Sequence, residues 1–413
     1  MPKQRTKGAE EQARRKPADS LLRRSRPPRL RPAGTAASRR RTAHVKRKVR
    51  KAARPRRTIT RRTAGQLKRS RENPILGPQS DHVWEAKATF NPAALYRRGV
   101  VHLLYRAIGS DDVSTLGYAA SADGRTIQER SPVPAYVHAR CVAERSYGPR
   151  IEYGSGGGGN GGCEDPRLVE IGGRVYLIYT AFDGWGSVRE ALSSIGLDDF
   201  LKRDWHWKPH VFISPPEEIH KNWVLFPEKI HGKYAILHSI SPTVQVAYVD
   251  SLDEFDGSRF IEGSVFRQSF DPEGSQTLNG MPARPRWDSW VRGAGPPPIR
   301  TKHGWLLLYH AMDRRDPNRY KLGALLLSLD DPTRVVARSR EPILEPDEQY
   351  ENEGHKAGVV YSCGAVLVGG DLHVFYGGAD TVVCVASATL DRFLDALRRG
   401  GAARLRRVPK PSD

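Results

Sequence analysis

The segment Gly173-Arg174-Val175-Tyr176-Leu177-Ile178-Tyr179-Thr180-Ala181 decides the fold class, because its pattern returns four more times along the chain. Each copy begins at a glycine turn, continues through an aliphatic and aromatic run of strand length, and ends in small or polar residues. The other copies span 99–107, 232–239, 304–311 and 370–379. Short apolar runs of this composition, bounded by glycine, predict β-strands.

The copies recur at a fairly regular interval, and each is followed by a second strand candidate such as 116–120 or 322–327. Repeated short strands with regular turn signals are typical of sandwiches, barrels and propellers. We therefore expect an all-β fold, a five-bladed β-propeller whose polar strand ends converge on one central pocket. The likeness of 72–78 to 341–346 is expected if a late strand completes the first blade. The clearest helix candidate spans 391–399.

The charge of the chain is concentrated at its start. Residues 1–71 hold 27 Lys and Arg and three acids, whereas the whole chain carries +21, so the remainder is slightly acidic. A segment with so much charge and no aromatic residue cannot bury a core, and we expect it to be disordered. It could contact nucleic acid or another polyanion, or have no specific role. The expected organisation is a tail over 1–71, a catalytic propeller over 72–400 and a second tail over 401–413.

No apolar run has the length of a signal peptide or a membrane span, so we expect a cytoplasmic protein without a membrane partner. Four cysteines are scattered without Cys-x-x-Cys spacing. This spacing predicts reduced thiols and no structural metal site. No cofactor is expected.

The candidate chemistry lies at Glu164-Asp165-Pro166-Arg167, directly after a glycine run over 154–162. The run lacks the Lys-Ser/Thr that completes a phosphate-binding P-loop. Because a proline restricts the residue before it, we expect Asp165 to be extended and presented in one direction. Its carboxyl could act as the general acid of glycoside cleavage. A surface pair of Glu164 with Arg167 at a simple turn is the alternative.

Eight short motifs extend this hypothesis, and they occur at 90–93, 104–107, 164–167, 225–229, 287–289, 293–299, 308–310 and 376–380. In this order they resemble glycoside hydrolase family 130, the mannoside phosphorylases and related mannosidases. The resemblance covers about 72–397 and implies a five-bladed propeller that cleaves β-mannosides with inversion. Inorganic phosphate would be the co-substrate of a phosphorylase, and a mannose-containing oligosaccharide the substrate.

The resemblance also implies roles for single residues. Asp165 would be the general acid, acting through a hydroxyl of the bound mannose. The residues expected to bind the sugar are Asn91, Arg106, Asp288 and Asp380. Those expected to face phosphate are Lys221, Asn222, His310 and Tyr320.

Two departures from the family pattern keep the attacking group open. Ser239 and Val291 stand where an arginine and a lysine are expected, and Arg292 could compensate only if its backbone turns it inward. Loss of two cations weakens a site for phosphate. One hypothesis is therefore phosphorolysis to α-mannose 1-phosphate. A second is hydrolysis with a carboxylate base, for which the candidates are Glu228, Asp288 and Glu353. A third is a non-catalytic propeller that binds glycans.

Overall fold

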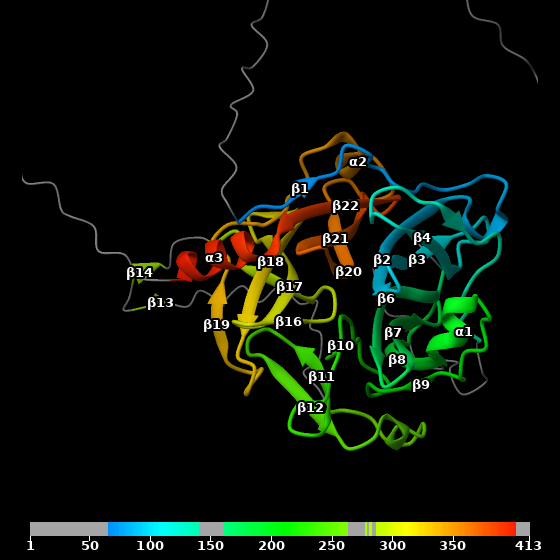
Figure 1. Cartoon of the computed structure of the whole chain (residues 1–413), viewed down its shortest axis with the longest axis horizontal. Helices are drawn as coiled ribbons and strands as arrows, with labels where there is room; N and C mark the ends of the chain where they lie inside the picture. The colour runs from blue at the N-terminus through cyan, green and yellow to red at the C-terminus, as the bar shows by residue number, and fades with distance from the viewer. Residues whose placement is uncertain (1–64, 140–159, 263–276, 279–280, 283–285, 402–413) are drawn as a thin grey trace, which may run out of the picture. The chain divides into compact units, whose positions relative to one another are not determined.

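The computed structural model describes residues 65–139, 160–262, 277–278, 281–282 and 286–401. Over these residues the protein is all-β, as expected, with a few short helices (Figure 1). The expected tails up to residue 64 and from residue 402, and the glycine run up to residue 159, lie outside the described residues.

The sheets are antiparallel meanders of consecutive strands. Two meanders share one eight-stranded sheet, where a single parallel pairing of Ser114 with Gly162 joins them. The strands of the first meander are β2 (Ala88–Arg97), β3 (Val100–Ile108), β4 (Ser114–Ser121) and β5 (Glu129–Arg130). Those of the second are β6 (Gly162–Ile171), β7 (Arg174–Phe182), β8 (Val188–Gly196) and β9 (Val211–Phe212).

Three further sheets follow the same plan. The third meander contains β10 (Val224–Leu225), β11 (Tyr234–Ser239) and β12 (Gln245–Val249). The fourth contains β15 (Trp290–Ala294), β16 (Ile299–Thr301), β17 (Gly304–Asp313), β18 (Asp316–Leu327) and β19 (Val335–Arg338). The fifth contains β20 (Val360–Val368), β21 (Asp371–Gly378) and β22 (Val382–Thr389), with β1 (Lys68–Arg69) paired to β22. A separate hairpin joins β13 (Thr277–Leu278) to β14 (Met281–Pro282).

The helical elements are short, and they are α1 (Leu197–Lys202), α2 (Gln349–Asn352), α3 (Leu390–Gly401), η1 (Val83–Glu85) and η4 (Leu252–Glu254). α3 is the helix expected at 391–399. It buries Phe393, Leu394 and Leu397 against the fourth and fifth meanders. None of the helices among the described residues is long and apolar enough to cross a membrane.

The five repeated segments are the strands β3, β7, β11, β17 and β21, so the strand prediction is confirmed. Their unbroken apolar runs reflect burial on both faces, since successive side chains point to opposite sides of a strand. In β17, Leu306 and Leu308 pack into a cluster shared with the fifth meander, while Leu307 and Tyr309 pack into one shared with the third.

The segment before the first meander pairs with the last sheet, whereas the sequence analysis expected a late strand to complete the first blade. β1 pairs with β22, and the Leu67 N–H donates to the Ile343 carbonyl. Residues 68 and 69, which the sequence analysis places in the tail, are therefore strand residues.

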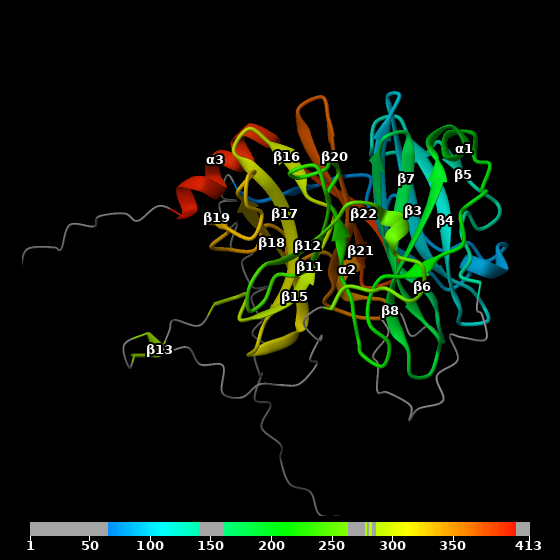
Figure 2. The same cartoon turned by 90° about the horizontal axis from the view of Figure 1, so that it is seen from below.

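The strands β2, β6 and β20 contact one another, so the first strands of three meanders lie side by side, where Figure 1 labels them; Figure 2 gives the same sheets from below. Each carries a register irregularity near its start, at 90–93, 164–167 and 361–364. A β-bulge redirects side chains that would otherwise follow the pleat. These three irregularities build the site described next.

Candidate active site

Asn91 and Asp165 occupy equivalent positions in β2 and β6, each followed by a proline inside a bulge. Their φ angles are 47° and 51°, so both backbones are left-handed. The extended conformation expected for Asp165 is therefore wrong, because the bulge outweighs the local preference set by Pro166. Left-handed non-glycine residues cost energy and gather at functional sites. The two side chains meet, and Asn91 Nδ2 donates to Asp165 Oδ1 over 2.8 Å.

Two buried carboxylates and two cations surround this contact. Arg106 Nη1 lies 3.7 Å from Asp165 Oδ1, and its Nη2 lies 3.1 Å from Glu164 Oε1. Lys221 Nζ lies 3.7 Å from Asp165 Oδ2 and 3.4 Å from Glu164 Oε2. Glu164 thus pairs with Arg106 and Lys221 in the interior, and the alternative of a surface pair with Arg167 is wrong.

The charges decide the protonation state of Asp165. Burial alone would raise its pKa, but Lys221, Arg106 and Arg167, together with the Asn91 hydrogen bond, hold it well below its usual range. Asp165 is therefore ionised without substrate. It can donate a proton only after something offsets the neighbouring positive charge.

Arg167 ties the acid to the segment that carries Lys221. It is fully buried, and its Nη1 donates to the Asp165 carbonyl over 2.7 Å. Its Nη2 donates to Asn222 Oδ1 over 2.7 Å, and Nε donates to the Gly295 carbonyl over 3.0 Å. Tyr361 OH donates to the same Asn222 oxygen. The side-chain oxygen of Asn222 therefore accepts two hydrogen bonds from other protein side chains.

His310 lies behind this network as a neutral ring. It stacks on Tyr361 with ring centres 3.7 Å apart, and its Nε2 accepts the Ser362 N–H over 3.0 Å. Burial, with the Arg167 charge, lowers its pKa to about 3. The proton of the neutral ring must then sit on Nδ1, which has no hydrogen-bond partner among the described residues. His310 can offer a donor to an anion but no positive charge.

Asp380 lies close enough to Arg106, Lys221 and Asp165 for their charges to act on its carboxyl. It is buried, left-handed with φ 50°, and follows β21 at its end. Burial raises its pKa, although the charges of Lys356, Arg106 and Lys221 act against this. The structure therefore brings five predicted residues together. The charges of Arg106 and Lys221 act on both Asp165 and Asp380, and Asn91 forms a hydrogen bond with Asp165.

The Asp288 carboxylate belongs to a hydrogen-bonding arrangement that recurs in two other meanders. It accepts from Tyr309 OH over 2.6 Å and pairs with Arg338 over 2.7 Å and with Arg286. Two other meanders contain the same tyrosine, buried carboxylate and arginine, and they are Tyr105–Glu85–Arg130 and Tyr376–Glu351–Arg69. The contacts of Asp288 are those of this repeated structural unit. The sugar contact expected of Asp288 stays a prediction.

The other two candidate bases are exposed and bind other side chains. Glu228 is half exposed and pairs with Arg300 over 2.7 Å. Glu353 is exposed and accepts from the Gln349 side chain.

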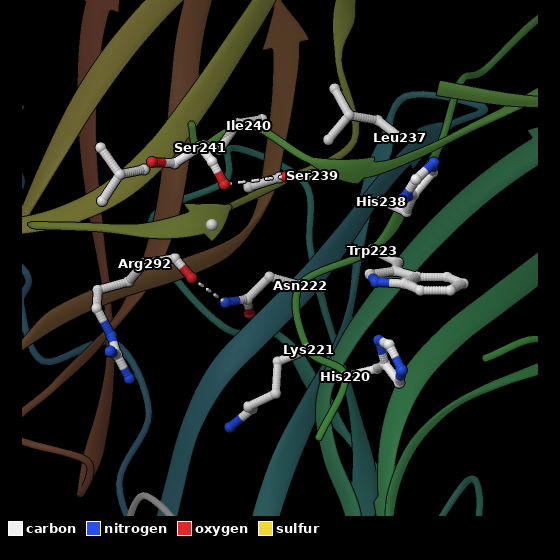
Figure 3. Close-up of a pocket in the computed structure, with 13 residues that line it drawn as sticks. His220, Lys221, Asn222, Trp223, Leu237, His238, Ser239, Ile240, Ser241 and Arg292 are labelled. Atoms are coloured by element: carbon white, nitrogen blue, oxygen red, sulfur yellow. Dashed lines mark hydrogen bonds between the residues drawn. The ribbon is translucent and has the colours of Figure 1, made fainter. Parts of the chain in front are cut away.

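The two departures from the family pattern line one small cavity of about 70 Å³ (Figure 3). Ser239 and Val291 share it with Lys221, Asn222 and Arg292. Asn222 Nδ2 donates to the Arg292 carbonyl over 2.9 Å, and Arg292 Nε donates to Tyr320 OH over 3.1 Å. Gly293 follows with φ 133°, and a side chain there would collide with Asn222. This close approach of the backbone turns Arg292 towards Tyr320.

Comparison with known proteins identifies the family of the chain. A family model described as beta-1,4-mannooligosaccharide phosphorylase, that of glycoside hydrolase family 130, matches residues 59–399. The chain belongs to glycoside hydrolase family 130. As a member of this family it is a carbohydrate-active enzyme.

Relatives within family 130 cover most of the chain. A 1,2-beta-oligomannan phosphorylase of Thermoanaerobacter sp. (strain X514) is 38% identical over 78% of this chain and 96% of its own length. A beta-1,2-mannobiose phosphorylase of the same organism is 34% identical over the same shares. The solved beta-1,2-mannobiose phosphorylase of Listeria innocua, in complex with beta-1,2-mannobiose, has a TM-score of 0.59 and 26% identity, over 81% of this chain and 99% of that one.

Three residues of this family 130 site escaped the sequence analysis. Tyr361 belongs to none of the eight motifs, and its stacking on His310 depends on the bulge in β20. Lys356 lies in a loop without a motif. Glu190 is fully buried beside Trp223, and β8, where it directly follows Arg189, carries no signal that marks it.

Proposed function

We propose that this family 130 enzyme is an inverting β-mannoside phosphorylase that acts on β-1,2 linkages and releases α-mannose 1-phosphate. The linkage follows from its relatives, since two that cover 78% of the chain are named for β-1,2-linked mannosides. The reaction follows from the site. The single observation that carries it is the position of Lys221, whose ammonium lies 3.7 Å from the carboxyl of Asp165.

In the proposed reaction, a phosphate oxygen forms a bond to the anomeric carbon while the glycosidic C–O bond breaks. The leaving oxygen takes a proton that Asp165 supplies through a hydroxyl of the mannose. Asn91, Arg106 and Asp380 hold the mannosyl unit. Attack from the face opposite the leaving sugar converts the β-linkage into an α-phosphate.

Lys221 gives phosphate a second effect beyond attack. Its charge contributes to holding Asp165 ionised in the free enzyme. A phosphate ion that approaches Lys221 offsets this charge, which raises the pKa of Asp165. Binding of the co-substrate therefore prepares the acid for proton transfer. Water, which carries no charge, would leave Asp165 ionised.

The contacts of the candidate bases also favour phosphorolysis. An inverting hydrolase needs a carboxylate that activates water on the opposite face of the sugar. Asp288 is engaged by Tyr309 and two arginines, and Glu228 and Glu353 are exposed. Hydrolysis remains the second candidate because Ser239 and Val291 line the cavity beside Lys221 without charge.

We also infer that the five meanders form a five-bladed propeller around this site. Five apolar clusters support it, because each packs between two meanders. They join the first to the second, the second to the third, the third to the fourth, the fourth to the fifth, and the fifth to the first. The catalytic residues would then lie where the first strands of the blades meet.

The remaining expectations stay predictions. Residues 1–64 and 402–413 lie outside the described residues, so contact with a polyanion through the tail is part of the proposal only. The cytoplasmic location and the absence of a cofactor other than phosphate are proposed on the same terms.

The proposed function is tested with purified enzyme and β-1,2-mannobiose, with and without inorganic phosphate. Phosphorolysis predicts mannose and α-mannose 1-phosphate in equal amounts, and formation only when phosphate is present. Equal release of free mannose in both conditions would instead establish the hydrolase.

A further inference from the structure

The residues predicted to face phosphate supply too little positive charge to bind a phosphate ion. Lys221 is shared between Glu164 and Asp165. His310 is neutral, and Asn222 has its oxygen bound by Arg167 and Tyr361. A phosphate ion needs charge-assisted donors that the protein holds in place.

Two other cations are held around Tyr320. Arg292 lies 4.5 Å above the Trp290 ring and donates to Tyr320 OH over 3.1 Å. Lys356 Nζ lies 4.7 Å above the Tyr320 ring, and its backbone N–H donates to the Ala379 carbonyl over 3.0 Å. A cation above an aromatic ring is attracted to it and restricted in position. Arg292 and Lys356 are therefore positioned before any ligand arrives.

These groups line a cavity of about 450 Å³ whose polar members are Trp290, Arg292, Asn318, Tyr320 and Lys356. Its volume falls in the range of small-molecule sites, which is about 300 to 1,000 Å³. The indole and the phenol each have a cation over one face. The cavity therefore presents positive charge and a hydroxyl, which suit an oxyanion better than the apolar face of a sugar.

The cavity adjoins the reaction centre from two sides. The Tyr320 ring lies 6.0 Å from that of Tyr361, which binds Asn222. Lys356 is bonded to Ala379, the residue before Asp380, and its charge acts on that carboxyl. In Figure 3 the side chains of Lys221 and Arg292 extend to the same side, away from Ser239. Both side chains also line the small cavity that contains Ser239.

We propose that Arg292 and Lys356, on either side of Tyr320, form the phosphate-binding pair of this enzyme. The pair supplies the positive charge that Ser239 and Val291 do not supply. The inference rests on the proposed phosphorolysis, although the binding of phosphate to this cavity can be measured without it.

The experiment compares Arg292→Gln and Lys356→Gln with wild type in two assays. Steady-state kinetics with β-1,2-mannobiose gives KM for phosphate and for the sugar. Titration calorimetry with inorganic phosphate gives the Kd without turnover. Loss of one charge-assisted contact predicts a rise of about tenfold or more in both phosphate constants, with the sugar KM within about twofold. Arg292→Lys, which keeps the charge, should recover part of the affinity.

Matched controls come from the other end of the same sheet. Arg300→Gln and Lys302→Gln each remove an exposed cation that pairs with Glu228 or Asp391. Both should leave the phosphate constants unchanged, and thermal unfolding of all variants shows whether they are folded. Wild-type phosphate affinity in folded Arg292→Gln and Lys356→Gln would overturn the proposal. So would a rise in the sugar KM alone, which would assign the cavity to the leaving sugar.

Failure of the proposed function is separate from failure of this inference. If wild type cleaves the mannoside without phosphate, phosphorolysis is wrong. Calorimetry then still decides whether the cavity binds phosphate through Arg292 and Lys356.

Discussion

The carboxyl of Glu190 should make the stability of the protein depend on pH near neutrality. Glu190 lies in β8 and is fully buried. Its Oε1 accepts from Thr180 Oγ1 over 3.3 Å and from the Trp223 N–H over 3.4 Å, while Oε2 has no partner among the described residues. Burial raises its pKa from 4.5 to about 7, although the charges of Arg167 and Lys221 oppose the shift.

The direction of the change in stability with pH follows from the protons that the folded and the unfolded protein bind. Between pH 4.5 and about 7 the folded protein keeps the Glu190 proton that the unfolded chain releases. The stabilisation is therefore complete below pH 4.5 and is lost as the pH rises through 7. A difference of about 2.5 pKa units corresponds to about 3 kcal/mol of unfolding free energy.

Glu190→Gln removes this dependence, because the amide keeps the Oε1 acceptor and cannot ionise. Urea unfolding at pH 4.5 and pH 8 measures it. Between these pH values, wild type should lose about 3 kcal/mol more than the variant does. Replacement of the exposed Glu341 by Gln is the matched control and should follow wild type. If wild type and Glu190→Gln lose the same free energy, the carboxyl is already ionised in the folded state and the reasoning is wrong.

Three further predictions concern the acid, the repeated unit and the chain start. Asp165→Asn should lower kcat by about 100- to 10,000-fold, as expected for loss of a general acid, with unfolding midpoint and sugar KM little changed. Asp288→Asn should lower the unfolding free energy by about 3 kcal/mol, because it disrupts a buried ion pair, and should leave kcat near wild type; a large loss of kcat at unchanged stability would instead support the predicted role of Asp288 in sugar binding. Deletion of 1–64 should leave mannoside cleavage and thermal stability unchanged, whereas deletion of 1–71 should destabilise the enzyme, because it removes β1 and the buried Leu67; equal melting temperatures for the two would contradict a stabilising role for the pairing of β1 with β22.

The strands were predictable because their signal is local. A glycine turn followed by an apolar run such as 304–311 needs only burial on both faces to become a strand, and β17 has it. The sheet that β1 joins was not predictable in this way. Two similar segments, 72–78 and 341–346, cannot show which sheet the chain start joins, since that depends on pairing between residues far apart in sequence.

The active site likewise has features that were predictable from the sequence and features that were not. Asp165 and Asn91 were predictable from Asp-Pro and Asn-Pro motifs, but their left-handed backbones are imposed by bulges that the sequence does not mark. Asp288 carried a motif, yet its partner Arg338 lies 50 residues away. The position of Lys356 over Tyr320 likewise depends on contact between two meanders.

The central claim is that Asp165 works with phosphate, and product analysis tests it most directly. β-1,2-Mannobiose is incubated with the full chain over a series of phosphate concentrations, and α-mannose 1-phosphate and free mannose are quantified. The account predicts a rate that rises from near zero and saturates with phosphate, with one α-mannose 1-phosphate formed per mannose. A rate that is independent of phosphate, with two mannose molecules per disaccharide, would contradict it.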